Sequence, residues 1–269
     1  MALIKDIDNR EMPLLEHLLE LRNRLMYAAG AILLGFLICY FFAADIYAFL
    51  VQPLADAYEG QTGRRMIYTS LTEAFFTYLK VAFWAGAFLA FPFVAIQLWM
   101  FIAPGLYANE KNAFLPFLVA TPALFFLGGA MVYYFIFPLA WRFFLSFETS
   151  GSPDTLPIEL EARVGEYLGL VMKLIFAFGL SFQLPVALTL MGRVGLVSSE
   201  ALMRNRKFAY VGVFVVAAVI TPPDIISQVG LGIPIIFLYE ISIWMVRMVE
   251  RKRAEAEGEE EAGTDVQST

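Results

Sequence analysis

The sequence predicts an all-α protein that crosses a membrane several times, and two observations lead to this fold class. Hydrophobic residues make up 59% of the 269 residues, against about 45–50% in soluble domains. They gather in long apolar runs, as membrane-spanning helices require. Prolines interrupt several runs and predict kinks that neighbouring helices must accommodate.

Six spans are expected, the fifth and sixth of them short. They lie at about Leu25–Phe42, Phe75–Leu98, Ala113–Leu139, Gly165–Met191, Phe208–Ile220 and Ile225–Met245. The fifth would be only about 20 Å long, against a hydrocarbon core of about 30 Å. A turn signal, Thr221-Pro222-Pro223-Asp224, follows it at once. A buried re-entrant hairpin is one interpretation of this region, and two short crossings that thin the bilayer are the other. Two crossings agree better with the charge distribution.

The segment before the first span, residues 12–24, is expected to form an amphipathic helix along the membrane surface. Its leucines recur at helical spacing on one face: Leu14, Leu18, Leu21 and Leu25. Another face carries His17, Glu20 and Arg24. This helix would present a carboxylate among basic neighbours at the edge of the bilayer.

The charges predict the orientation. Thirteen of the 19 lysines and arginines fall at the termini and in the loops on their side, if there are six spans. Cytoplasmic segments are enriched in these residues, so both termini are expected in the cytoplasm. We expect residues 1–250 to form one membrane domain and the acidic tail, residues 251–269, to be disordered. Residues 43–74 and 142–164 are expected to be long loops on the other side.

Several classes of function are disfavoured by composition. One cysteine, Cys39, excludes an intramolecular disulfide or a thiolate cluster, and one histidine excludes a multi-histidine metal site. No cofactor or metal is expected, and nothing suggests nucleic-acid binding. An intramembrane enzyme would need more catalytic groups than these.

Two carboxylates are the main candidates for ligand binding. Glu20 could simply pair with Arg24, four residues on, and Glu110 could simply stabilise a helix N-terminus. If there are six spans, both lie on the cytoplasmic side at the same depth. Two such carboxylates would suit a ligand with two guanidinium groups. In the fourth span, Gln183 could bond to another helix of the chain or to the transmembrane helix of a partner.

Four motifs in order resemble the C subunit of the twin-arginine protein translocase, the TatC family. They are His17-Leu18-Leu19-Glu20-Leu21-Arg22-Asn23-Arg24, Phe101-Ile102-Ala103-Pro104-Gly105-Leu106-Tyr107 with Glu110, Phe178-Gly179-Leu180-Ser181-Phe182, and Thr221-Pro222-Pro223-Asp224-Ile225-Ile226-Ser227-Gln228. The resemblance covers roughly residues 12–250.

The resemblance implies six helices in a concave, cupped arrangement and a function in protein export. Such proteins receive signal peptides that carry paired arginines, and they assemble with small single-span subunits of the TatA/TatB type in the bacterial inner membrane. Export of folded cargo is driven by the proton-motive force. A complex with several copies of the chain is also implied.

The resemblance also assigns roles to residues. Glu20 and Glu110 are similar to the carboxylates that bind the arginines, with His17, Arg22 and Phe101 around them. The outer-side or partner-facing positions are Pro53, Gln183, Asp224 and Gln228.

Gln183 departs from the family, because many members have a glutamate there. Glutamine keeps the hydrogen-bonding capacity but has no titratable proton. The alternative function is a small-solute secondary transporter, although the sequence offers mainly Gln183 at the midplane and no inverted repeat.

Overall fold

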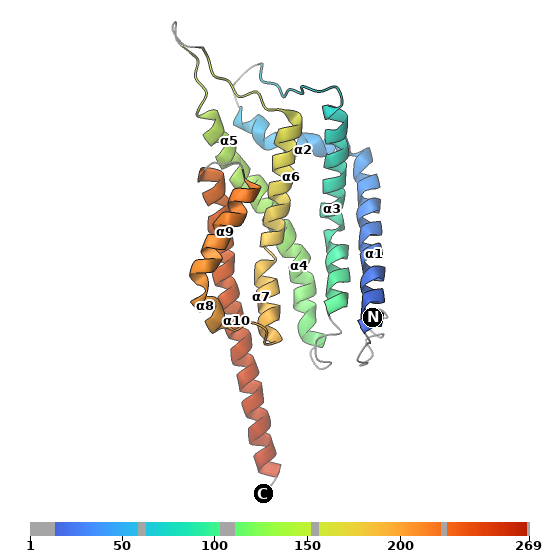
Figure 1. Cartoon of the computed structure of the whole chain (residues 1–269), viewed down its shortest axis with the longest axis vertical. Coiled ribbons are helices and arrows are strands. Elements are labelled where there is room, and N and C mark those ends of the chain that lie inside the picture. The colour runs from blue at the N-terminus through green and yellow to red at the C-terminus, as the bar shows by residue number, and fades with distance from the viewer. Residues whose placement is uncertain (1–13, 59–62, 103–110, 152–155, 222–224, 268–269) are drawn as a thin grey trace. The chain divides into compact units, whose positions relative to one another are not determined.

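The computed structural model describes residues 14–58, 63–102, 111–151, 156–221 and 225–267 (Figure 1). These residues are helical with few exceptions, and the only β-type pairings described among them are two isolated bridges. Five helical stretches are long and apolar enough to cross a membrane: Leu15–Phe41, Glu73–Phe101, Phe117–Leu145, Val164–Arg193 and Gln228–Glu255. The prediction of an all-α polytopic membrane protein is therefore confirmed, while the count of six spans stays a prediction.

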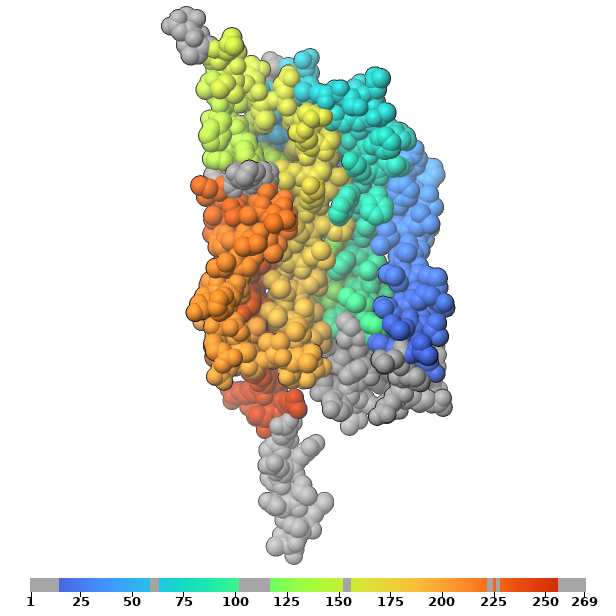
Figure 2. Space-filling view, viewed as in Figure 1, coloured from blue at the N-terminus to red at the C-terminus, as the bar shows by residue number. Residues whose placement is uncertain are grey.

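The described chain divides into two compact units, residues 1–176 and 177–269. In the first unit, α1 (Leu14–Phe41) and α3 (Glu73–Ile102) lie side by side (Figures 1 and 2). Their backbones meet at two glycines. A β-carbon on Gly35 would lie 2.6 Å from the carbonyl oxygen of Gly86, and one on Gly86 would lie 2.3 Å from the amide nitrogen of Phe36. Only glycine allows this approach, so the two residues determine how the helices pack.

Helix α1 is continuous through the segment that was expected to lie on the membrane surface. It runs from Leu14 to Phe41 without a break. The described part of the segment 12–24 is thus the beginning of the spanning helix, because no proline or glycine lies between Leu14 and Gly30.

A helix also occupies much of the expected loop at 43–74. This helix, α2 (Ala43–Ala57), follows α1 after one residue and contains Pro53 as a buried residue. It lies beside the N-terminal parts of α3 and α6 (Val164–Ser181), where the Tyr47 and Tyr78 rings are 5.3 Å apart and Tyr167 Oη donates to Leu50 O. The expectation of a long loop was wrong for residues 43–57, because they form a helix whose apolar side chains pack against other helices of the first unit.

The third and fourth long stretches are interrupted near prolines. In the third, α4 (Lys111–Met131) passes through a π-helical turn, η4 (Val132–Ile136), into α5 (Phe137–Leu145), and Pro138 lies at the start of α5. In the fourth, α6 ends at Ser181 and α7 (Leu184–Arg193) begins one residue before Pro185. Proline has no N–H to donate to the preceding turn, which explains both interruptions.

The second unit contains the end of α6, then α7, α8 (Ser199–Arg204), α9 (Arg206–Ile220) and α10 (Ile225–Gln267). A β-carbon on Gly192 would lie 2.7 Å from Val246 Cγ1, and one on Gly232 would lie 2.8 Å from Phe214 Cε1. These glycines bring α7 and α9 close to α10. With 15 residues, α9 is about 22 Å long and too short for an ordinary span.

Helix α10 extends further than the predicted sixth span. It continues to Gln267, through most of the tail that was expected to be disordered. Strong helix formers (Glu, Ala, Lys and Arg) dominate residues 250–262. Arg251 Nε also donates to Glu255 Oε1 at 2.8 Å, one turn on.

The glycine contact between α1 and α3 leads to a prediction about stability. We expect Gly86→Leu to lower the free energy of unfolding by about 3 kcal/mol, the upper part of the range for overpacking, because its side chain would meet the α1 backbone. Thermal unfolding of the purified protein in detergent would measure this. Gly30→Leu on α1 is the matched control, since a β-carbon there meets nothing within 4 Å. Equal effects of the two substitutions would contradict the role given to Gly86.

Candidate functional site

The candidate binding site lies where the first turns of α1 meet the end of α3. Among its described residues are His17, Glu20 and Arg24 from α1 and Phe101 from α3. The close packing of α1 on α3 keeps these side chains together.

Glu20 forms an ion pair with Arg24 that uses only one carboxylate oxygen. Arg24 Nε donates to Glu20 Oε1 at 2.7 Å, and Arg24 Nη2 contacts the same oxygen. The pair that the spacing of four residues predicted is therefore present. The other oxygen, Oε2, is buried and accepts no hydrogen bond from the described residues. It is an acceptor with unused capacity.

His17 connects the carboxylate to an aromatic residue on α3. Its ring stacks on Phe101 with a centroid distance of 4.3 Å and an interplanar angle of 12°. His17 Nδ1 lies 3.9 Å from Glu20 Oε2, which is too far for a hydrogen bond. The stacked pair thus lies next to the unused oxygen without satisfying it.

One other predicted site residue, Arg22, does not join this group. Arg22 is exposed, two residues along the helix from Glu20, and donates to Asn23 Oδ1 at 3.3 Å. Glu110 lies outside the described residues.

In the second unit, Gln183 lies at the junction of α6 and α7. Its Nε2 is 3.5 Å from the carbonyl oxygen of Gly179, one turn back. Gln183 precedes the first residue of α7, and Pro185 lies in the first turn of that helix, where the break between the two helices occurs.

Gln228 connects α10 to α9, since its Nε2 donates to Phe214 O at 3.2 Å. Within the described structure, its amide thus joins two helices of the same chain. Asp224 lies outside the described residues, and Pro53 is buried within α2 of the first unit.

A second polar cluster, which we call the loop cap, consists of residues 63–72, 146–151 and 156–163. Residues 63–72 precede α3, residues 146–151 follow α5, and residues 156–163 precede α6. Arg64 pairs with both oxygens of Glu148, with Nη1–Oε1 at 2.8 Å and Nη2–Oε2 at 2.5 Å. The amide of Leu160 donates to Glu148 Oε1 at 2.8 Å, and Tyr58 Oη donates to Leu160 O at 3.2 Å.

A second ion pair connects the loop cap to α3. Glu73, the first residue of α3, accepts hydrogen bonds from Arg163 Nη2 at 3.2 Å and from the amide of Gly165 at 3.2 Å. Backbone bonds join the same segments, from Ile67 N to Ala162 O and from Val164 N to Ile67 O. The loop cap therefore holds together the starts of α3 and α6.

Comparison with known proteins identifies the family. The sequence model described as "Sec-independent protein translocase protein (TatC)" matches residues 16–234. A protein of that name from Magnetococcus marinus is 53% identical over 253 residues, which cover 94% of this chain and 90% of the relative. The protein of that name from Escherichia coli K12 is 38% identical and covers 87% and 88% of the two chains.

This chain belongs to the TatC family. A solved structure called the twin arginine translocase receptor TatC has a TM-score of 0.75 and 35% identity, and the match covers 87% of this chain and 99% of that one. The chain is thus a translocase subunit, not an enzyme, and an integral protein of the bacterial inner membrane. This family assignment does not favour the alternative of a small-solute transporter.

The loop cap is one part of this TatC protein that sequence reasoning missed. The expected loops contain arginines and glutamates, including Arg64, Arg163, Glu73 and Glu148. That balance of charges was a signal for ion pairs between the loops, but it does not say which residues pair.

Glu148 leads to a prediction about pH. Burial alone would raise its pKa, but the hydrogen bond from Leu160 and the Arg64 guanidinium together hold the pKa of this carboxyl below its usual range. A lowered pKa in the folded state stabilises the protein at pH values above about 4.3, the usual value for glutamate. This stabilisation is lost as the pH falls through the lowered pKa.

We therefore expect the midpoint temperature of thermal unfolding to decrease when the pH is lowered below about 4. Glu148→Gln should weaken this dependence of the midpoint on pH. Unfolding scans between pH 7 and pH 3 would measure both. Glu161→Gln is the control, because its pair with Arg65 spans 3.7 Å between side chains that are 51% and 75% exposed, and such pairs contribute little. A Glu148→Gln profile that matched the unsubstituted protein would rule out this carboxylate as the source.

Proposed function

We propose that this chain is the receptor that recognises twin-arginine signal peptides and that Glu20 binds one of the two arginines. The observation that supports this proposal is the carboxylate oxygen Oε2 of Glu20, which accepts no hydrogen bond from the described residues and lies beside a stacked aromatic pair. The solved relative is itself called a twin arginine translocase receptor.

The chemistry of the site favours arginine over lysine. A guanidinium group is planar, donates hydrogen bonds from several nitrogens and stacks on aromatic faces, whereas an ammonium is a compact point charge. Arg24 occupies Oε1 and leaves Oε2 to an incoming guanidinium. That guanidinium can also contact the rings of His17 and Phe101.

The second arginine of the peptide is assigned to Glu110, on the basis of the family resemblance. Arg22, which is exposed on another face of α1, is proposed to contact the rest of the signal peptide.

Both termini are proposed to lie in the cytoplasm, because most lysines and arginines belong to the segments on that side. The site on α1 would then face the compartment in which signal peptides are made. The acidic tail after residue 250 would also be cytoplasmic.

The remaining predicted residues are proposed to serve assembly. The family is that of a protein translocase component, and we propose small single-span subunits of the TatA/TatB type and further copies of this chain as partners. Gln183, Gln228, Asp224 and Pro53 are the candidate positions on the partner-facing or outer side. The proton-motive force is the proposed energy source, although glutamine at position 183 cannot itself carry a proton.

The test of the receptor proposal is the binding of a twin-arginine signal peptide to the protein in membrane vesicles. We expect Glu20→Gln to weaken binding roughly ten- to a hundredfold, the effect of removing a charge-assisted hydrogen bond. Photocrosslinking from probes beside Glu20 and Glu110 would measure it, with a matched peptide that carries two lysines as the negative reference.

Glu16→Gln is the matched control, because Glu16 is an exposed carboxylate one turn before Glu20 on the same helix. It should leave binding unchanged. If Glu20→Gln and Glu16→Gln bound the peptide equally well, or if the two-lysine peptide crosslinked as strongly as the two-arginine peptide, Glu20 would be a structural residue only.

A further inference from the structure

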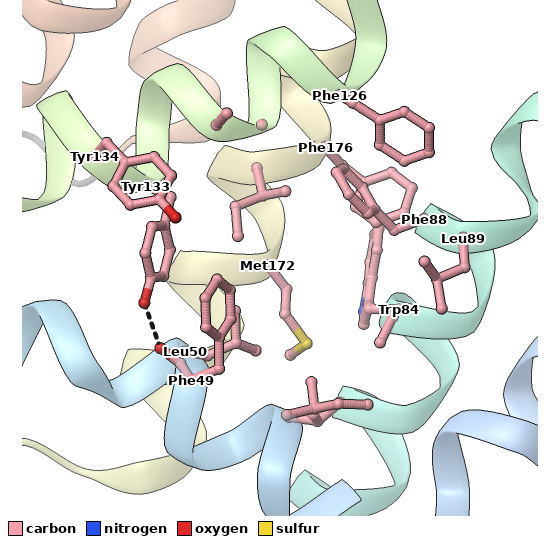
Figure 3. A pocket seen from close by; sticks show the side chains of 16 residues that line it. Phe49, Leu50, Trp84, Phe88, Leu89, Phe126, Tyr133, Tyr134, Met172 and Phe176 are labelled. Carbon is pink, nitrogen blue, oxygen red and sulfur yellow. Dashed lines mark hydrogen bonds between the residues drawn. The ribbon is translucent and has the colours of Figure 1, made fainter. Parts of the chain in front are cut away.

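An apolar pocket in the first unit has no role in the function proposed above. It has a volume of about 340 Å³ and lies between α2, α3, α6 and the stretch from α4 to η4 (Figure 3). Aromatic and aliphatic side chains line it, among them Trp84, Phe88, Phe126, Tyr133, Met172 and Phe176. The Tyr133 hydroxyl, one of its few polar groups, already donates to Phe49 O at 2.7 Å. The pocket therefore suits an apolar ligand.

The depth of the pocket places it within the hydrocarbon core, mostly in one half of the bilayer. Helix α3 has 30 residues and is about 45 Å long, so a hydrocarbon core of about 30 Å begins roughly 7 Å from its first residue, Glu73, if the helix is centred. Its lining residues from Val81 to Leu89 then lie roughly 12–24 Å from that end. At this depth the surrounding medium is lipid acyl chain.

Two lysines flank the pocket near the level where the hydrocarbon begins. Lys80 precedes the lining residue Val81 on α3, and Lys173 follows the lining residue Met172 on α6. Both side chains are exposed, and no ion pair to a carboxylate is recorded for either in the described parts of the chain. A long lysine side chain can extend along apolar surface and place its ammonium group at the membrane interface. The two charges favour a ligand with an anionic head.

The shape of the pocket depends on the π-helical turn. The turn η4 contains Tyr133 and Tyr134, adjacent residues that both line the pocket. Such turns are uncommon and occur often at functional sites. Gly129, one turn earlier, also lines it, and a β-carbon there would lie 2.9 Å from Phe88 Cζ. The wall is thus built from specific local geometry rather than from loosely packed side chains.

We propose that this pocket binds one acyl chain of an anionic phospholipid, whose phosphate contacts Lys80 and Lys173. The lipid would fill the apolar space between α3 and α6 and connect these helices at the level of their lysines. Anionic lipid would then be a bound component of this protein in the membrane, independently of signal-peptide recognition.

The experiment uses the full chain in vesicles of phosphatidylcholine with or without phosphatidylglycerol. Each lipid would carry the same photoactivatable diazirine in the middle of one acyl chain, and labelled residues would be mapped by proteolysis and mass spectrometry. We expect labelling at Trp84, Phe88, Met172 and Phe176, with a preference for the phosphatidylglycerol probe on the order of tenfold from two lysines.

Two variants separate the parts of the proposal. Lys80→Gln with Lys173→Gln should reduce labelling by phosphatidylglycerol to the level of phosphatidylcholine, while Lys252→Gln on α10, a helix that contributes no lining residue, should not. Ala130→Trp places a large side chain on the pocket wall and should remove pocket labelling by both probes. Ala123→Trp on the same helix is its control, because Ala123 is exposed and does not line the pocket.

Three results would overturn the proposal. The first is labelling spread evenly over exposed residues such as Leu33 and Phe135, without enrichment in the pocket. The second is equal labelling by the two lipid probes in the unsubstituted protein. The third is pocket labelling that persists in Ala130→Trp. Loss of signal-peptide binding in Glu20→Gln would leave all these measurements unaffected.

Discussion

The backbone contact between α1 and α3 at Gly35 and Gly86 is the constraint on which the candidate site depends. In a membrane, apolar side chains gain little by leaving lipid, so close backbone approach and van der Waals packing hold helices together. This contact sets the register in which His17 on α1 meets Phe101 on α3. Glu20, one turn after His17, thereby lies beside the aromatic pair. The position of a polar site at one end of the helices thus follows from two glycines, Gly35 in the second half of α1 and Gly86 near the middle of α3.

Ion pairs restrain α3 at its other end. The loop cap joins the starts of α3 and α6 through Arg64–Glu148 and Arg163–Glu73, and each carboxylate also accepts backbone amide bonds. Charged hydrogen bonds of this kind are shorter and stronger than neutral ones. The apolar pocket is lined by α3 residues before and after Gly86, and its walls come from several helices at once. Long polar loops and an apolar transmembrane pocket are therefore parts of one arrangement within the first unit.

The interruptions in the helices show how far local sequence rules reach. The break between α6 and α7 lies beside Pro185, where a kink was predicted. Among the prolines of the third stretch, Pro138 follows the π-helical turn, whereas α4 continues through Pro116 and Pro122. A missing N–H identifies the place where a helix can deviate. Whether it bends, changes register or continues depends on the neighbouring helices, as Pro53 within α2 also illustrates.

The sequence by itself determined the fold class, the approximate spans, the family motifs and the pairing of Glu20 with Arg24, because apolar length and helical spacing are local properties. It did not reveal α2, since a helix of 15 residues next to a span resembles a loop when its packing partner is unknown. The stack of His17 on Phe101, the single unused oxygen of Glu20, the pairing within the loop cap and the lysine-flanked pocket join residues far apart in the chain. Only the tertiary structure decided these, because such contacts depend on helix register and close packing, which no local pattern encodes.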